Sequence, residues 1–530
     1  MDNPQFKMGS PLCIYHVDLN FVNINYDYLR NWLSRLADMG FNAVLWEIED
    51  KVQLETCRDA VVSDAMSKDE FRSILDEAAS FGLEPIPLLQ TIGHAEYILM
   101  QEPYSRMREL PDHHDCFCTE KPEVRTFLKQ LITEYLDLFG DIRYFHLGGD
   151  EAYVFAQCPV CSEEAEKVGR NALYARHIMD IAEPIHKKGA RAGIWCDMVL
   201  NHPEQMDAIP DELILWDWNY WDVDGPMENV RVWGKGRLTR EELTDDLLSR
   251  YPEIVGPDDK LRGFYTADAL KRMGFDVFLC SAVRSAGDSM FCPRTHLHAR
   301  NIAGAARKAA EAELLGTCVT DWAIRMNSWE THRSLLPIAP MILKDPSISV
   351  EDGLHSIGEG LFGTDPSLFI QALDMISEPA FPFSGRHTGI QWNGLKDSLP
   401  APKNYIRDLL QGWKEDGTLD REKNNIDNVI AQIESGIEKL NTFRDIAETG
   451  SDLLDYWLKA AEFQLRQAQT VQQILNDNRT ADNKKTLQKL KADYEKFLCF
   501  DQTPESAAKN AGLVYDCLIE YMGESGKTKS

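Results

Sequence analysis

The feature of this sequence that most limits its fold is a series of eight short apolar segments in the first 320 residues, separated by longer helical stretches. The segments are rich in Val, Ile, Leu and Trp and lack the alternation of a half-exposed strand, so we expect strands buried on both faces. They lie at residues 12–18, 42–47, 84–89, 143–147, 191–196, 213–218, 276–280 and 316–320.

Helical patterns fill the intervals between these strands, for example at 28–39, 68–81, 122–139 and 172–188. Most of them end in a Gly-containing turn, as expected at a helix C-terminus. Eight β-then-α units predict an α/β fold, a (β/α)8 TIM barrel with its active site at the C-terminal ends of the strands. A doubly wound open sheet is the structural alternative, but the Gly-rich phosphate-binding turn that it would need after an early strand is missing.

The composition changes along the rest of the chain. We expect a TIM-barrel catalytic domain over 1–345, a transitional segment with Pro and Gly over 346–400, and an α-helical C-terminal domain over 401–530 that is rich in Glu, Lys, Gln, Ala and Leu. Helices are predicted at 403–413, 421–448, 453–475, 484–497 and 504–521. This helical domain could either pack on the barrel or form a homodimer.

The charge balance excludes two classes of partner. The chain has 56 Lys and Arg against 85 Asp and Glu, a formal net charge of −29. Nucleic acids and anionic membranes both need a cationic surface, so neither is an expected partner. The sequence also lacks a signal peptide pattern and an apolar run of about 18 residues. With twelve scattered cysteines, which reduced thiols explain most simply, these features predict a cytoplasmic protein.

Two adjacent acids, Asp150 and Glu151, follow the fourth predicted strand in the segment YFHLGGDE at 144–151. The two glycines leave room for a substrate ring to approach the backbone. Paired carboxylates at the mouth of a barrel are costly because like charges raise one another's pKa, which is typical of a catalytic site. The alternative explanation is a helix N-terminus, where acids are common because the helix dipole favours them.

The segment HLGGDE resembles the signature of glycoside hydrolase family 20, the β-N-acetylhexosaminidases. Further segments resemble the hexosaminidase D branch of that family, occur in the family's order over roughly residues 10–345, and fall at the ends of the predicted strands. They are YHVD at 15–18, WEIED at 46–50, QTIGHAEY at 90–97, WNY at 218–220 and TDW at 320–322. The GGDE block is fairly specific, whereas the other segments are specific only as an ordered set.

This resemblance implies a retaining, substrate-assisted release of terminal β-linked GlcNAc or GalNAc, one of the exceptions to the usual two-carboxylate scheme. Glu151 would be the general acid and then the general base, which requires a raised pKa. Asp150 would stay ionised and orient the 2-acetamido group, whose carbonyl oxygen attacks the anomeric carbon. Tyr220 would donate its hydroxyl hydrogen to that oxygen. No cofactor is required.

Aromatic and polar residues at the predicted strand ends could form the sugar pocket, because indole faces stack on sugar rings and polar groups recognise hydroxyls. The candidate substrate-binding residues are His16, Asp18, Glu49, His94, His146, Trp195, Asp197, Trp218 and Trp322. Asp288 is equally explained by a structural role, and Trp216 and Trp221 are better explained as core residues.

Two departures from the lysosomal and secreted hexosaminidases concern this pocket. Those enzymes carry an Arg near the first strand, where this chain has YHVD, and a Trp-x-Glu at the eighth strand, where this chain has Trp322-Ala323-Ile324. Their N-terminal α/β domain is also missing. The contacts to the distal hydroxyls and the preference between gluco and galacto configurations therefore stay open.

Four cysteines flank the fourth predicted strand: Cys116 and Cys118 before it, and Cys158 and Cys161 after it. Four thiolates on two loops could form a structural tetrahedral zinc site. The spacing is compatible with zinc without being diagnostic, and free thiols are the default interpretation.

Two other functions stay open. One is a non-catalytic sugar-binding or sensing protein on the same barrel, and the other is a hydrolase of modified acetamido sugars or oligosaccharides. A binding protein needs no proton donor, so the intact pair Asp150 and Glu151 favours a hydrolase.

Overall fold

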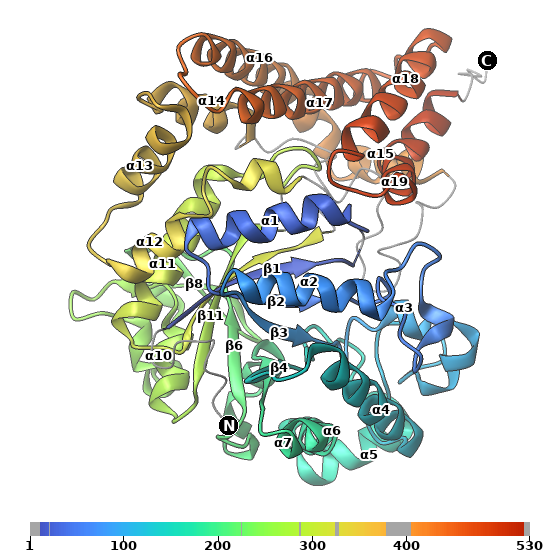
Figure 1. Cartoon of the computed structure of the whole chain (residues 1–530), viewed down its shortest axis with the longest axis vertical. Helices are drawn as coiled ribbons and strands as arrows, with labels where there is room; N and C mark the ends of the chain where they lie inside the picture. Colours follow the sequence, from blue (N-terminus) through green and yellow to red (C-terminus); the bar gives the residue numbers. More distant parts are fainter. Residues whose placement is uncertain are drawn as a thin grey trace.

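Eight parallel strands close into a barrel in the computed structural model, which describes residues 11–20, 22–223, 225–285, 288–323, 328–377 and 404–523 (Figure 1). The first strand pairs with both the second and the last, so the sheet has no free edge. The strands are β1 Leu12–Asp18, β2 Ala43–Glu47, β3 Glu84–Leu88, β4 Tyr144–His146, β5 Arg191–Trp195, β6 Ile214–Trp218, β11 Val277–Arg284 and β12 Gly316–Asp321. The predicted TIM barrel is therefore confirmed, and each predicted strand is present.

The alternation of side chains along β1 shows why these strands are apolar on both faces. Leu12 and Ile14 point into the barrel, where they pack with side chains such as Trp216. Tyr15 and Val17 point outward and pack under the surrounding helices. Because period-2 alternation sends every second side chain inward, the next inward position is His16, a polar residue at the mouth of the barrel.

Helices surround the barrel, and each loop that leaves a C-terminal strand end can contribute to the site. One predicted helix, 172–188, is divided into two because the ring of Pro184 would clash with a carbonyl of the preceding turn. The helices of this region are α1 Tyr26–Met39, α2 Lys68–Ser80, α3 Glu96–Leu99, α4 Pro122–Phe139, α5 Pro159–Val168, α6 Arg170–Ile181, α7 Glu183–Lys187, α8 Asp197–Leu200, α9 Asp245–Arg250, α10 Tyr265–Arg272, α11 Thr295–Glu311 and α12 Ile338–Lys344.

A small antiparallel insertion lies between β6 and β11, where no strand is predicted. It contains the hairpin of β8 (Asn229–Val232) and β9 (Gly236–Thr239), and the pair of β7 (Pro226–Met227) and β10 (Leu261–Arg262). The insertion has an apolar core of its own, which includes Val230, Leu247, Tyr251 and Ile254. The alternation along β8 and the glycines of its turn are the sequence signals for this hairpin.

The C-terminal part of the chain is helical, with α16 and α17 running side by side beyond the barrel (Figure 1). Its helices are α13 Val350–Phe362, α14 Ser367–Ser377, α15 Tyr405–Glu415, α16 Thr418–Arg444, α17 Ser451–Leu475, α18 Ala481–Leu498 and α19 Pro504–Gly523. The five helices predicted after residue 401 are present, whereas 378–400 of the predicted transitional segment lies outside the described residues. Among the described helices, none has the length and apolar character needed to cross a membrane.

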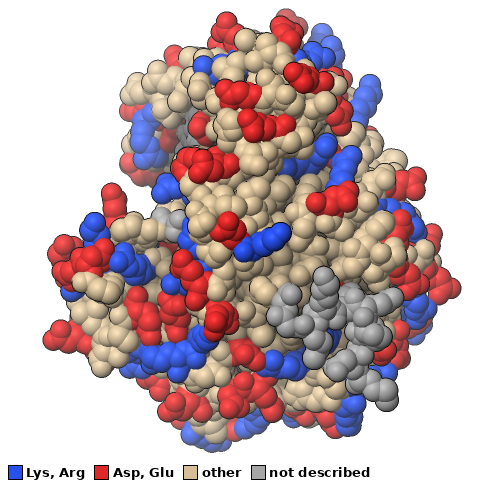
Figure 2. Space-filling view, turned by 60° about the vertical axis from the view of Figure 1, so that its left-hand side comes forward, with Lys and Arg blue, Asp and Glu red and all other residues tan. Residues whose placement is uncertain are grey.

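The turn between α18 and α19 fixes this helical region to the barrel near the start of α1. The backbone N–H of Asn25 donates to the carbonyl of Asp501 at 2.8 Å, and the N–H of Thr503 donates to the carbonyl of Asn23 at 2.8 Å. The hydroxyl of Ser328 donates to the buried Asp501 carboxylate. On the face shown in Figure 2, acidic and basic side chains are interspersed.

We predict that Asp501→Asn removes part of the pH dependence of stability. Burial raises the pKa of Asp501 to about 7, so its contribution to stability is greatest at low pH and is lost as the pH rises from about 4 to about 7. Relative to the Asn variant, the wild type should therefore lose about 3 kcal/mol between pH 5 and pH 8. Denaturant unfolding at four pH values measures this difference, with exposed Asp482→Asn as the control. Parallel curves for wild type and Asp501→Asn would contradict the prediction.

Candidate functional site

The two acids of the GGDE segment lie at the mouth of the barrel because the chain turns sharply after β4. Gly148 and Gly149 have φ angles of 61° and 87°, in the left-handed region that favours glycine. A Cβ atom at Gly148 would collide with the side chain of Gln90, and one at Gly149 would collide with the hydroxyl of Tyr174. Only glycine fits both positions, and the turn delivers Asp150 and Glu151 to the strand ends.

His94 contacts both carboxylates. Its Nε2 lies 3.4 Å from Oδ2 of Asp150 and 3.5 Å from Oε2 of Glu151. His94, Glu151 and Glu49 all have positive φ angles, of 52°, 44° and 40°. Such strain in non-glycine residues is typical of functional sites, and here it occurs at the ends of three neighbouring strands.

Glu151 is held from two sides while its carboxylate stays a third exposed. The Tyr153 hydroxyl donates to its Oε1 at 2.7 Å, and its own backbone N–H donates to Oδ2 of Asp197 at 3.0 Å. The other oxygen of the buried Asp197 accepts the indole N–H of Trp218 at 3.3 Å. Glu151 therefore has a fixed position with access to solvent, as a proton donor needs.

Glu151 faces an open cleft of about 260 Å³. One wall is the inserted hairpin of β8 and β9, which supplies Arg231 and Trp233. The guanidinium of Arg231 lies 4.6 Å from the ring centroids of both Trp221 and Trp233. The insertion thus places the cation of Arg231 and the indole of Trp233 on the wall of the cleft that Glu151 faces.

Asp150 is buried, and its two oxygens differ. Oδ2 faces His94, whereas the buried Oδ1 has no hydrogen-bond partner among the described residues. A buried carboxylate oxygen without a donor is costly, so such an atom normally meets a donor from another molecule or from water. The position of Oδ1 therefore marks a point where a ligand N–H or O–H can be recognised.

The pKa values of the pair run opposite to the predicted order. Burial raises the pKa of Asp150 above its usual range, although His94 opposes this. Burial also acts to raise the pKa of Glu151, but hydrogen bonds from His94 and Tyr153 and the charge of His94 hold it below its usual value. The pKa of His94 lies well above its usual value, since the two carboxylates outweigh its burial. The prediction of a raised pKa for Glu151 was wrong, because it did not include His94 as a direct partner.

The predicted aromatic residues form two layers. Trp195 and Trp216 are fully buried inside the barrel, where each packs against the buried His146, with ring centroids 4.2 and 4.8 Å from it. Nearer the surface, Tyr220 stacks on Trp218 at 5.1 Å and lies 6.3 Å from the partly exposed Trp322. The upper layer is the one that a sugar ring can reach.

A buried polar cluster at the ends of β1 and β2 contains three further candidates, His16, Asp18 and Glu49. His16 Nε2 lies 3.0 Å from Oε2 of Glu47, whose other oxygen accepts from the Gln90 amide at 3.0 Å. Burial and the neighbouring Glu47 raise the pKa of Asp18 to about 6, and burial raises the pKa of Glu49 well above its usual value. These acids are close enough to influence one another's protonation.

Asp288 has a structural role instead. Its Oδ2 lies 2.8 Å from Nε2 of His298, and its Oδ1 accepts from the guanidinium of Arg294 at 3.0 Å. Both carboxylate oxygens of Asp288 are therefore paired, and its side chain is fully buried.

Four residues that shape the site were not among the predicted ones: Gln90, Tyr153, Arg231 and Trp233. Gln90 begins the segment QTIGHAEY and Tyr153 lies two positions after Glu151, so both could have been predicted from the sequence motifs. Arg231 and Trp233 lie in the insertion, whose position beside Glu151 depends on the tertiary fold.

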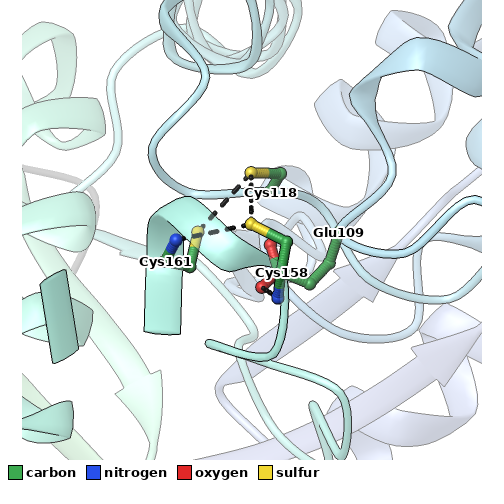
Figure 3. A group of neighbouring side chains, drawn as sticks. All are labelled: Glu109, Cys118, Cys158 and Cys161. Carbon is green, nitrogen blue, oxygen red and sulfur yellow. Dashed lines mark hydrogen bonds between the residues drawn. The ribbon is translucent and has the colours of Figure 1, made fainter. Parts of the chain in front are cut away.

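The cysteine prediction needs one correction. Cys118, Cys158 and Cys161 lie together, but the fourth member of the group is Glu109 and not Cys116 (Figure 3). The Cys116 thiol donates instead to the carbonyl of Phe117 at 3.6 Å.

Part of this chain is similar to known proteins. Residues 42–232 match the model of the glycosyl hydrolase family 20 catalytic domain, which confirms the resemblance to family 20 for this part of the chain. Hexosaminidase D of Bos taurus is 27% identical over 215 residues, 39% of this chain and 62% of the bovine protein. Lacto-N-biosidase of Bifidobacterium bifidum is 26% identical over 212 residues, 37% of this chain and 18% of that protein.

The similar region covers less than two thirds of the length of each of these two relatives. Among solved structures, the chitobiase of Flavobacterium johnsoniae is 16% identical with a TM-score of 0.46, over 95% of this chain and 78% of that one.

Proposed function

We propose that this chain, which carries a family 20 catalytic domain in its barrel, is a glycoside hydrolase, an exo-acting β-N-acetylhexosaminidase that releases terminal β-linked GlcNAc or GalNAc from oligosaccharides. One observation carries the proposal. Asp150 and Glu151 are adjacent at the barrel mouth, yet one is buried with an unpartnered oxygen and the other faces a cleft.

The two acids suit two different tasks. Oδ1 of Asp150 would accept the N–H of the 2-acetamido group and turn its carbonyl oxygen toward the anomeric carbon. That oxygen attacks as Glu151 protonates the glycosidic oxygen, the bond to the leaving group breaks, and an oxazolinium ion forms. In the second step Glu151 takes a proton from water, which opens the ring at the anomeric carbon. Two inversions retain the configuration, and no protein nucleophile is needed.

The pocket around this chemistry would be aromatic. Tyr220, stacked on Trp218, is the proposed donor to the acetamido oxygen, and Trp322 would contact the sugar ring. The proposed hydroxyl contacts come from the polar candidates His16, Asp18, Glu49, His94 and Asp197.

Glu151 must gain a proton before it can act as an acid. Its pKa lies below its usual value in the site, so substrate binding has to raise it. A sugar that excludes water and places an oxygen acceptor beside the carboxyl would favour its protonated form. We therefore propose that Glu151 takes up its proton only when substrate is bound.

The test is hydrolysis of aryl β-N-acetylglucosaminide and β-N-acetylgalactosaminide by the full chain. Turnover with retained configuration is expected, and a thiazoline analogue of the intermediate should inhibit it. An active enzyme that the thiazoline does not inhibit would contradict substrate assistance. A protein that binds these sugars without hydrolysing them would support a sensor instead, and activity confined to modified acetamido sugars would redefine the substrate.

We predict that His94→Asn moves both limbs of the kcat pH profile, which reports the substrate complex, to higher pH. Asn tolerates the positive φ at this position, so the backbone can keep its conformation. Loss of His94 removes the contacts that hold down the pKa values of Asp150 and Glu151. Activity then fails at a higher pH on the acidic side, where Asp150 gains its proton, and persists to a higher pH on the basic side, where Glu151 loses its own.

The pH profile of kcat at saturating substrate measures both limbs. His355→Asn, on α13, is the control, since its side chain is 42% exposed. A profile that falls in height without moving along the pH axis would assign His94 a structural role only.

The proposed compartment is the cytoplasm, in keeping with twelve cysteines that are all free thiols. A homodimer through α15–α19 is the proposed assembly, and light scattering tests it. No metal or cofactor takes part in the proposed reaction.

A further inference from the structure

Three sulfur atoms lie close together outside the proposed active site. Sγ of Cys118 lies 3.7 Å from Sγ of Cys158 and 3.5 Å from Sγ of Cys161 (Figure 3). Tetrahedral zinc holds sulfurs at ~2.3 Å, which places two sulfur ligands ~3.8 Å apart. The separations in this group are therefore near those of a tetrahedral thiolate site, and they are far longer than the ~2.05 Å of a disulfide.

Glu109 completes the group with a carboxylate. Its Oε1 accepts the backbone N–H groups of Gln157 and Cys158, both at 2.8 Å. Its Oε2 is buried and has no hydrogen-bond partner among the described residues. One donor atom from each of the four side chains lies within 4.8 Å of the others, and all four residues are buried. A buried carboxylate oxygen beside three thiols calls for a cation.

The backbone supports thiolates at this point. Cys158 precedes α5, and its sulfur accepts the N–H of Cys161 at 3.4 Å, across the turn Cys158-Pro159-Val160-Cys161. The Thr119 hydroxyl lies 3.8 Å from the sulfur of Cys161. Such donors around ligand atoms orient them and stabilise their charged forms.

We propose that Glu109, Cys118, Cys158 and Cys161 bind one structural zinc ion. Three soft thiolates and one carboxylate in a tetrahedral arrangement suit zinc, and no ligand position is left for a substrate. Three thiolates, one carboxylate and one Zn²⁺ have a net charge of −2. The surrounding N–H donors stabilise this charge.

The ion would connect two loops of the active site. Cys158 ends the loop after β4, seven positions after Glu151, and Cys161 lies in the first turn of α5. Glu109 and Cys118 belong to the segment between α3 and α4. That segment is bonded to the residues around His94, since the N–H of Ala95 donates to the Asp115 carbonyl at 3.0 Å and the N–H of Phe117 donates to the Ile92 carbonyl at 2.9 Å. Zinc would thus fix the loops of His94 and Glu151 relative to each other.

The test is elemental analysis of the full chain, produced without a metal-affinity tag in zinc-supplemented medium and purified without chelator. About one zinc per chain is expected. Cys161→Ser and Glu109→Gln should reduce the zinc content several-fold and lower Tm. Cys116→Ser is the matched control, because this buried thiol lies two residues from Cys118 and outside the group, so its zinc content should equal that of the wild type.

A second measurement needs no variant. An organomercurial should release the zinc of the wild type in proportion to the thiols it modifies, and Co²⁺ in place of zinc should give the intense visible absorption of a tetrahedral thiolate site. Wild type without zinc, a Cys118 disulfide seen by intact mass, or equal zinc loss in Cys116→Ser would each overturn the proposal. Activity is not needed for any of these readouts, so failure of the proposed hydrolase function would leave the zinc result unaffected.

Discussion

Glu151→Gln is expected to lower kcat about a thousandfold on a substrate whose leaving group is another sugar. The amide keeps the size of the side chain and can still accept the Tyr153 hydroxyl, but it cannot give a proton to the glycosidic oxygen. The barrier therefore rises because a poor leaving group must depart as an alkoxide. Steady-state kinetics on a disaccharide and on an aryl glycoside measure the effect.

The choice of leaving group makes the test specific to the acid role. An aryl glycoside with a strongly acidic phenol needs little proton donation in the first step, so Glu151→Gln should lose less activity on it than on the disaccharide. Glu163→Gln is the matched control, since Glu163 is exposed on α5 and pairs with Lys167 at 2.8 Å. An equal loss on both substrates, or full activity on the disaccharide, would show that Glu151 is not the general acid.

Asp150→Asn is expected to lower kcat by about 10²–10³, whatever the leaving group. The variant removes the charge that would stabilise the oxazolinium ion, and its amide can present an N–H to the acetamido N–H. Binding of a thiazoline inhibitor should weaken by a similar factor, because that inhibitor resembles the charged intermediate. Competitive inhibition and kcat on two leaving groups measure the two effects.

Stability separates a catalytic Asp150 from a structural one. Asp150 is buried with an unpartnered oxygen and a raised pKa, so replacing it by a neutral amide should leave Tm unchanged or higher. Lower activity with a lower Tm would indicate damage to the fold. Lower activity with undiminished thermal stability is the result that assigns the residue to the reaction.

The barrel could be predicted from the sequence because parallel strands buried on both faces leave a simple signal. The run that forms β1 has apolar residues on both faces, with Leu12 and Ile14 inside and Tyr15 outside, before the polar residues of its C-terminal end. The site acids were also within reach, since the two glycines before Asp150 mark a turn that larger residues cannot make.

What the sequence could not provide were the partners that come from other loops. His94 is 56 positions before Asp150 and reverses the expected pKa order of the two acids. Glu109 replaces Cys116 in the sulfur cluster because direction, and not spacing alone, decides which side chains meet. Both depend on the packing of one loop against the next.

The hairpin of β8 and β9 has a consequence for protein engineering. It belongs to the insertion between β6 and β11, whose apolar core around Val230, Tyr251 and Ile254 is distinct from that of the barrel, and β8 and β9 pair with each other. It nevertheless forms one wall of the cleft beside Glu151. We therefore expect that exchanging this hairpin changes the shape of the cleft beside Glu151, while the barrel strands and the turn that carries Asp150 and Glu151 stay as they are.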